Sequence, residues 1–299
     1  MPVFLNATDP NFEAEFQTLL SAKREDSPDV DQVVADIIAD VRARGDAALL
    51  EYTERFDRLT LTSETLRLSG AEIAAEIQKV APEDRAALEL AAERIRTYHA
   101  EQMPQDAWWT DASGAELGWR WTPVSAAGLY VPGGLATYPS SVLMNAIPAK
   151  VAGVERLAIT VPTPDGAINP LVILAAELAG VDEIYRIGGA QAIAALAYGT
   201  PSVAPVDKIT GPGNAFVAAA KRRVFGKVGI DMIAGPSEIL VIADKDNNPD
   251  WIALDLLSQA EHDESAQSIL ITDDADFASA VLASVDKFLQ TLERRDIAG

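Results

Sequence analysis

The sequence predicts an α/β fold in which helices cover both faces of a mostly parallel sheet. Two observations carry this prediction. Short apolar runs, glycine-containing turns and alanine-rich helical stretches alternate at nearly constant spacing between residues 160 and 235. The alternation resumes over residues 238–299, and the first hundred residues have helical periodicity. With 299 residues, the chain is long enough for about two domains.

The first hundred residues are expected to be helical. Val33, Ile37 and Val41 recur every four residues, which is typical of one face of a helix. We expect Asp46 to cap the next helix, because a carboxylate can accept hydrogen bonds from first-turn amides. Pro82 suits the first turn of a later helix, where no amide hydrogen is needed.

A β-hairpin is predicted after these helices. Residues 108–110 and 117–121 are strand-like and rich in tryptophan, and residues 111–114 form a glycine-containing turn between them. We expect the tryptophans to pack the hairpin against the helices.

The glycine-containing turns predict the position of a ligand site. Predicted strands at 157–161, 183–187, 208–210 and 230–233 each run into a turn that contains glycine or proline. Right-handed crossovers would gather these turns at the carboxyl edge of one sheet. Open α/β sheets bind their ligands at that edge.

The last sixty residues predict a second, incomplete sheet. Residues 251–259 favour a helix, 268–272 a strand and 274–292 a helix. In a parallel sheet another strand should follow, and none does. We therefore expect the second unit to lack part of its sheet.

Composition narrows the classes of function. The formal net charge is −21, which would repel a nucleic-acid backbone. The chain has no cysteine, which excludes disulfides, thiolate metal ligands and a cysteine nucleophile. Neither a signal peptide nor an apolar run of the ~20 residues that cross a bilayer is recognisable. We expect a cytoplasmic protein that binds neither nucleic acid nor membrane.

Three glycine motifs contain candidate ligand contacts. In the motif at 128–134, Tyr130 could stack on a flat ring or simply fill a gap in a tight turn. In the motif at 188–191, Gln191 could hydrogen-bond a ribose or phosphate, although the G-x-G-x-x-G fingerprint is absent. In the motif at 210–214, Asn214 either caps the following helix or faces a ligand.

Two later motifs contain polar candidates. Ser237 follows a Gly-Pro pair at a strand edge and could donate to a substrate, but no G-x-S-x-G elbow makes it a nucleophile. Gln259 and His262 lie three residues apart and would share one helix face. His262 is a candidate metal ligand, although a zinc site takes about four ligands. The alternative is a polar helix end, with His262 near the negative end of the helix dipole.

Taken in order, the five motifs resemble the histidinol dehydrogenase family, and the resemblance runs to the end of the chain. The motifs are GLYVPGG, IGGAQA, TGPGN, GPSE and QAEHD. The resemblance implies a zinc-containing homodimer of histidine biosynthesis that oxidises L-histidinol to L-histidine through an aldehyde, in two NAD-dependent steps.

The resemblance also implies roles for particular residues. Tyr130, Gln191 and Asn214 would contact NAD. Substrate would contact Ser237, Gln259 and His262, and the last two would also ligate zinc.

The resemblance implies two Rossmann-like units. Residues 1–129, with the helices and the hairpin, would join residues 238–299 in a discontinuous α/β domain. Residues 130–237 would form a contiguous NAD-binding domain. The family's catalytic Glu-His pair, and an aspartate and a histidine that complete the zinc site, are expected beyond Gly299. We therefore expect this chain to be an inactive truncated form.

Two alternatives stay open. The chain could belong to a paralogous zinc- and NAD-dependent dehydrogenase of another small polyol. It could also be a non-catalytic fragment.

Overall fold

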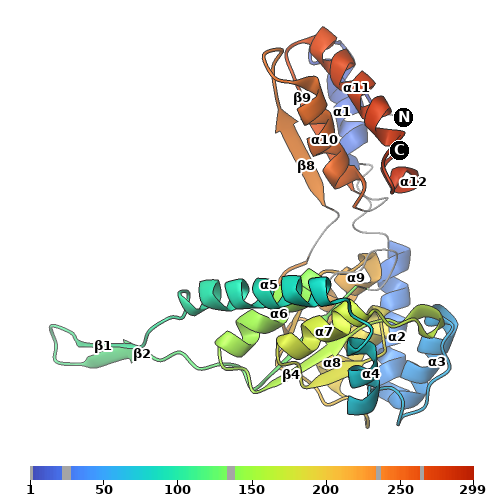
Figure 1. Ribbon diagram of the computed structural model, residues 1–299. Helices are drawn as coiled ribbons and strands as arrows, with labels where there is room; N and C mark the ends of the chain where they lie inside the picture. The colour runs from blue at the N-terminus through green and yellow to red at the C-terminus, as the bar shows by residue number, and fades with distance from the viewer. Residues whose placement is uncertain (1–2, 22–27, 133–138, 234–236, 263–265) are drawn as a thin grey trace. The chain divides into compact units, whose positions relative to one another are not determined.

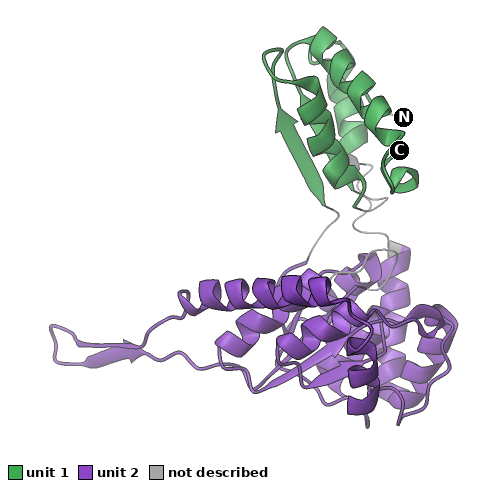
Figure 2. Ribbon diagram, viewed as in Figure 1, with its two compact units in different colours: residues 1–25, 235–299 green, residues 26–234 purple. Residues whose placement is uncertain are grey.

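The computed structural model describes residues 3–21, 28–132, 139–233, 237–262 and 266–299 (Figure 1). The chain forms two compact units (Figure 2). Residues 26–234 make up the larger unit, and residues 1–25 with 235–299 make up the smaller one.

The larger unit is built on a parallel sheet of five strands in the order β5-β4-β3-β6-β7. The strands are β3 (Ala126–Tyr130), β4 (Arg156–Thr160), β5 (Glu183–Tyr185), β6 (Lys208–Thr210) and β7 (Gly229–Ile230). The predicted parallel sheet is thus confirmed. The chain moves outward from β3 to β4 and β5, then returns to add β6 and β7 on the other side of β3.

One face of this sheet is covered by four helices that share one apolar core. They are α2 (Pro28–Arg44), α3 (Asp46–Asp57), α8 (Gly189–Tyr198) and α9 (Ala215–Val224). Val34 and Val41 of α2 are buried in the same cluster as Ala126 of β3 and Ile193 of α8. The alanine-rich sequence of α8 allows this close packing, because small side chains let helices approach a sheet.

The other face is covered by a second set of helices around a second core. They are α4 (Gly70–Ile77), α5 (Pro82–Ala100), α6 (Pro139–Val151) and α7 (Pro170–Leu178), and a short 3₁₀ helix, η1 (Pro164–Gly166), precedes α7. Pro82 occupies the first turn of α5, as predicted. Leu129, Leu157 and Ile159 point to this side of the sheet. Helices therefore cover both faces, as expected.

The predicted hairpin is confirmed, but its predicted packing is wrong. Strands β1 (Ala107–Thr110) and β2 (Glu116–Trp119) pair antiparallel, and the hairpin extends away from the helical layers (Figure 1). Trp108 is 71% exposed, and all of β2 is exposed. Trp109 and Trp119 instead meet each other, with ring centroids 5.2 Å apart.

The smaller unit contains a parallel pair of strands, β8 (Glu238–Ile242) and β9 (Gln267–Ile271). Its helices are α1 (Phe12–Ser21), α10 (Pro249–Ala260), α11 (Ala275–Leu289) and α12 (Arg295–Ala298). Ala253, Phe277 and Val281 are buried in its core.

Two local expectations on the N-terminal helices are wrong. Val33 is 45% exposed while Val34 is fully buried, so the buried face runs through Val34, Ile37 and Val41. Asp46 is the first residue of α3 rather than its cap. Its carboxylate instead accepts hydrogen bonds from the amide and hydroxyl of Ser202.

We expected residues 26–129 to share a unit with residues 238–299, and the observed division into units is different. Residues 26–129 lie in the same unit as the sheet. The reason is packing: the apolar face of α2 forms one core with α8 and α9.

Candidate functional site

The strand order places a candidate ligand site between the carboxyl ends of β3 and β6. These neighbours are the strands from which the chain departs in opposite directions, and ligands of open α/β sheets bind at such a switch point. The backbones approach closely there. A Cβ on Gly211, which follows β6, would lie 2.2 Å from the carbonyl oxygen of Tyr130 at the end of β3. Only glycine fits this position.

Tyr130 lies at this edge with its side chain buried. Its hydroxyl oxygen accepts a hydrogen bond of 3.1 Å from the amide of Gly189, in the first turn of α8. Burial raises the pKa of this phenol to about 12. The ring fills a gap in the core, which was the alternative weighed from the sequence, and the hydroxyl orients the Gly188–Gly189 turn.

Gln191 occupies the first turn of α8 and is 2% exposed. Its Oε1 atom is buried without a hydrogen-bond partner. The neighbouring Gly189 has a φ of 63°, and a Cβ there would lie 2.7 Å from this oxygen. The glycine therefore keeps space beside an amide whose acceptor is unsatisfied.

Asn214 caps α9, which was one of its two expected roles. Its side-chain oxygen accepts a hydrogen bond of 3.2 Å from the amide of Val217. The residue is exposed beside the turn that follows β6. Capping thus holds the side chain at the carboxyl edge of the sheet.

Two threonines at this edge were missed from the sequence. The hydroxyl oxygens of Thr160 and Thr210 are buried without a partner. Thr160 ends β4 in register with Tyr130, and Thr210 ends β6. A threonine that ends a strand before a turn is a weak signal, because strands favour threonine for packing alone.

Buried polar atoms are normally hydrogen-bonded. The unsatisfied oxygens of Thr160, Gln191 and Thr210 all lie near the carboxyl edge. This arrangement fits a polar ligand, and a dinucleotide with its ribose hydroxyls and phosphates has the required chemistry.

The other three candidates lie in the smaller unit. Ser237 immediately precedes β8, and its carbonyl oxygen accepts a hydrogen bond of 3.1 Å from the amide of Gln267 in β9. Gln259 is in the last turn of α10. His262 follows that helix, and its amide donates to the carbonyl of Gln259. The structure thus brings Gln259 and His262 together at one helix end.

Three of the predicted motifs extend outside the described residues. Gly133 and Gly134 of the first glycine motif lie there, as do Gly235 and Pro236 before Ser237. Asp263 after His262 does as well.

The metal donors in the described part of the chain are incomplete. No group of three or more His, Cys, Asp or Glu side chains that could hold a metal occurs among those residues. Gln259 and His262 supply two donors, whereas zinc takes about four.

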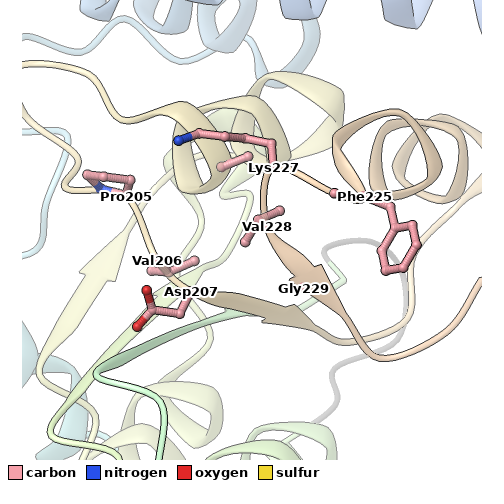
Figure 3. A pocket seen from close by; sticks show the side chains of 9 residues that line it. Pro205, Val206, Asp207, Phe225, Lys227, Val228 and Gly229 are labelled. Carbon is pink, nitrogen blue, oxygen red and sulfur yellow. The ribbon is translucent and has the colours of Figure 1, made fainter.

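A pocket also lies at the opposite, amino edge of the sheet. A shallow pocket of about 380 Å³ lies where the chain enters β6 and β7, lined among others by Asp207, Phe225 and Lys227 (Figure 3). Asp207 there accepts a hydrogen bond from the amide of Ala126. No residue predicted from the sequence to bind ligand lines this pocket, so we assign no binding role to it.

The fold and the polar carboxyl edge define an α/β protein with a candidate site for a polar ligand at the switch point of its sheet. The histidinol dehydrogenase family model matches residues 20–299. The chain is 78% identical to histidinol dehydrogenase of Ruegeria pomeroyi and 74% identical to that of Cereibacter sphaeroides, each over 100% of this chain and 69% of the relative. It therefore belongs to the histidinol dehydrogenase family, which consists of NAD-dependent oxidoreductases of histidine biosynthesis.

A solved structure agrees. Histidinol dehydrogenase from Elizabethkingia anophelis has a TM-score of 0.86 to this chain at 39% identity, over 95% of this chain and 66% of that one. The chain thus spans about two thirds of the length of these relatives.

Proposed function

We propose that the protein oxidises L-histidinol to L-histidine through the aldehyde, with NAD accepting the hydride in each of two steps. The observation that carries the proposal is the 78% identity to a histidinol dehydrogenase over the whole chain. The unsatisfied polar atoms at the carboxyl edge of the larger unit support it, because a bound cofactor would supply the hydrogen-bond partners that these atoms lack.

In this proposal the larger unit binds NAD. Tyr130 fixes the amide of Gly189 through its hydroxyl, Gln191 offers its unpaired amide oxygen, and Asn214 faces the cofactor from the cap of α9. NAD supplies the hydride acceptor when it is bound. The protein supplies its position and excludes water around the reacting carbon.

In the same proposal the smaller unit binds substrate. Gln259 and His262 would each give one ligand to a zinc ion, and Ser237 would hydrogen-bond the substrate. Zinc would supply a positive charge that orients the substrate's nitrogens. The described residues provide two of about four ligands, so we derive no step that depends on the metal.

The catalytic proton transfers are proposed to come from residues outside this chain. Oxidising an alcohol requires a base within hydrogen-bond reach of its proton. The sequence resemblance assigns the second oxidation to a Glu-His pair beyond Gly299. We therefore expect residues 1–299 alone to produce no NADH from histidinol and to bind little zinc.

We further propose that the whole protein is a cytoplasmic homodimer. The exposed tryptophans of the hairpin support a partner subunit, because large exposed apolar groups mark interaction surfaces.

In the described part of the chain, no helix has the length and apolarity to cross a membrane. The net charge of −21 disfavours nucleic acid as a partner.

The test is NADH production by the whole protein with zinc present. L-histidinol should give two NADH per substrate, and a panel of small polyols should give none. Turnover of another polyol with no turnover of histidinol would instead support the paralogous dehydrogenase. No turnover with any substrate, from folded and zinc-loaded protein, would contradict both enzyme functions.

A further inference from the structure

An ion pair between a buried lysine and a partly exposed aspartate holds the turn that follows β6. Lys221 of α9 is 2% exposed, and its Nζ donates a hydrogen bond of 2.9 Å to the carbonyl oxygen of Gly211. The same ammonium forms an ion pair with Oδ1 of Asp231. Oδ2 of Asp231 accepts a hydrogen bond of 2.8 Å from the amide of Gly211. Both backbone polar groups of Gly211 are therefore held by one pair of side chains.

The pair joins three elements at the edge proposed to bind NAD. Lys221 comes from α9, Gly211 directly follows β6 and Asp231 directly follows β7. The amide of Asp231 also donates to the carbonyl of Ile209 in β6. Gly211 needs such support because its φ is 116° and its Cα lies against the backbone of Tyr130.

The stability of the fold does not by itself explain why Lys221 and Asp231 are paired here. Lys221 is buried whereas the Asp231 side chain is 30% exposed. The ammonium therefore loses its hydration, while water screens part of its attraction to the carboxylate. The pair does, however, fix the path of residues 211–214, and this turn carries Asn214 to the cap of α9. The main effect of the pair is therefore to set the position of the turn.

We propose that Lys221 and Asp231 are positioning residues for NAD. They hold the 211–214 turn against β3 so that the cofactor meets a preformed edge, since binding to a preorganised site avoids the cost of ordering it. This inference rests on the proposed function of the same edge. Neither side chain needs to touch the cofactor for this role.

The test uses three variants of the whole protein. Lys221→Met removes the ammonium and leaves the carboxylate of Asp231 unpaired. The double variant Lys221→Met with Asp231→Leu removes both charges, so the fold keeps an apolar contact without an unpaired charge. Arg223→Met is the matched control on α9, because Arg223 pairs with Asp31 on the surface and not with the turn.

Three measurements separate positioning from stability. They are the melting temperature without NAD, KM and kcat for NAD, and deuterium uptake by the amides of Gly211, Gly213 and Asn214. In the single variant we expect a lower melting temperature and a KM raised about tenfold or more. In the double variant the melting temperature should recover only in part, because no charge is unpaired but both polar groups of Gly211 lose their partners. KM should stay raised, kcat should stay within about twofold of wild type and uptake should stay faster. The control should change none of these values.

The outcomes are distinguishable. Wild-type KM and uptake in the double variant would overturn the inference and leave the proposed function intact. Failure of the double variant to fold would also overturn it, since the pair would then serve the fold itself. Failure of the wild-type protein to bind NAD would overturn the proposed function and this inference together.

Discussion

Single side chains decide how closely β3 and β6 approach at the candidate cofactor edge. Gly211 lies against the backbone of Tyr130, and Lys221 with Asp231 holds it from the other side. Tyr130 in turn holds the first turn of α8 through its hydroxyl. Small changes at these positions should therefore affect both stability and cofactor binding.

The first prediction concerns Gly211→Ala. The new Cβ would meet the carbonyl oxygen of Tyr130 at 2.2 Å, at a φ of 116°, so we expect a loss of about 3 kcal/mol or more in the free energy of unfolding. Gly226→Ala is the control, because Gly226 has a φ of 95° and open space around it. It should cost only about 1–2 kcal/mol. Urea denaturation measures both, and equal losses would show that the contact with Tyr130 does not matter.

The second prediction concerns the alkaline range. Burial raises the pKa of Tyr130 to about 12, from about 10 in the unfolded chain. The folded state therefore disfavours the phenolate, and this stability contribution is complete below pH 10 and declines as pH rises through 12. Tyr130→Phe cannot ionise but leaves the amide of Gly189 unpaired. The variant should be less stable than wild type at pH 8, by about 1–3 kcal/mol, and the difference should narrow between pH 10 and 12.

A constant difference up to pH 12 would contradict this account. Tyr98→Phe is the control, because Tyr98 is largely exposed. It should leave stability unchanged at both ends of this range.

Some residues of the candidate site could be predicted from the sequence, and others could not. Asn214 as a cap followed from local chemistry, because the side chain and the amide of Val217 are three residues apart. Lys221 could not be found in that way. A lysine on a helix is normally exposed, and its burial depends on Asp231, which lies ten residues further along the chain.

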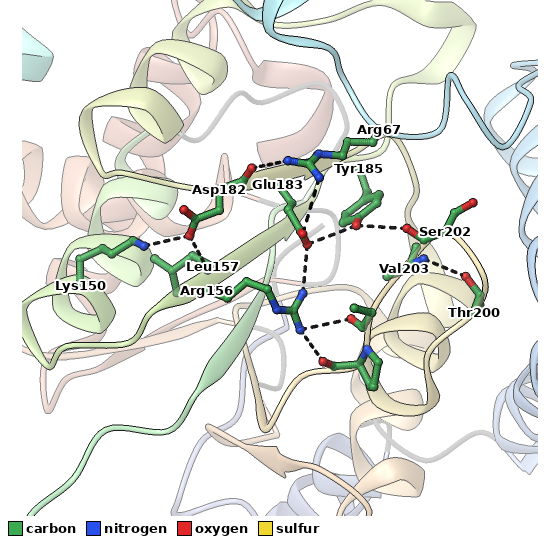
Figure 4. A network of polar contacts seen from close by, with 12 residues as sticks. Arg67, Lys150, Arg156, Leu157, Asp182, Glu183, Tyr185, Thr200, Ser202 and Val203 are labelled. Carbon is green, nitrogen blue, oxygen red and sulfur yellow. Dashed lines mark hydrogen bonds and ion pairs between the residues drawn. The ribbon is translucent and has the colours of Figure 1, made fainter.

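At the scale of elements, a polar network ties the amino ends of β4 and β5 together (Figure 4). The carboxylate of Glu183 accepts from Arg156 at 3.0 Å and from the hydroxyl of Tyr185 at 3.2 Å, and Arg67 lies 3.6 Å away. Glu183 is largely buried. The network lies at the amino edge of the sheet, whereas the unpaired oxygens of Thr160, Gln191 and Thr210 lie near the carboxyl edge proposed to bind NAD.

The third prediction concerns Glu183→Gln. The amide cannot balance two guanidinium groups, so we expect a loss of about 2 kcal/mol in the free energy of unfolding. Glu51→Gln is the control, because Glu51 pairs with Arg44 on the surface, and it should leave the denaturation midpoint unchanged. Equal effects of the two substitutions would show that burial of Glu183 does not strengthen its contacts.

Elements were easier to predict than their packing. The alternation of apolar runs predicted the strands of the sheet, and the turn chemistry predicted the hairpin. The exposure of Trp108 was not predictable, because burial depends on what the rest of the molecule places beside a strand. The pairing of α2 with α8 and α9 likewise depends on contacts between segments that are about 150 and about 180 residues apart, which no local pattern reports.

At the scale of the whole molecule, the candidate residues divide between the two units. Tyr130, Gln191 and Asn214 lie in the larger unit, and Ser237, Gln259 and His262 lie in the smaller one. The family resemblance predicted both sets, but the sequence did not predict this boundary near residue 26. We propose that cofactor and substrate are bound by different units.

The most direct test compares Gln191→Met and His262→Asn in the whole protein, through KM for NAD, KM for L-histidinol and bound zinc. Gln191→Met keeps the volume and removes the amide, so KM for NAD should rise about tenfold or more with zinc retained. His262→Asn should lose zinc and raise KM for L-histidinol, with NAD affinity unchanged. Loss of zinc in the first variant, or of NAD affinity in the second, would contradict the division between the units.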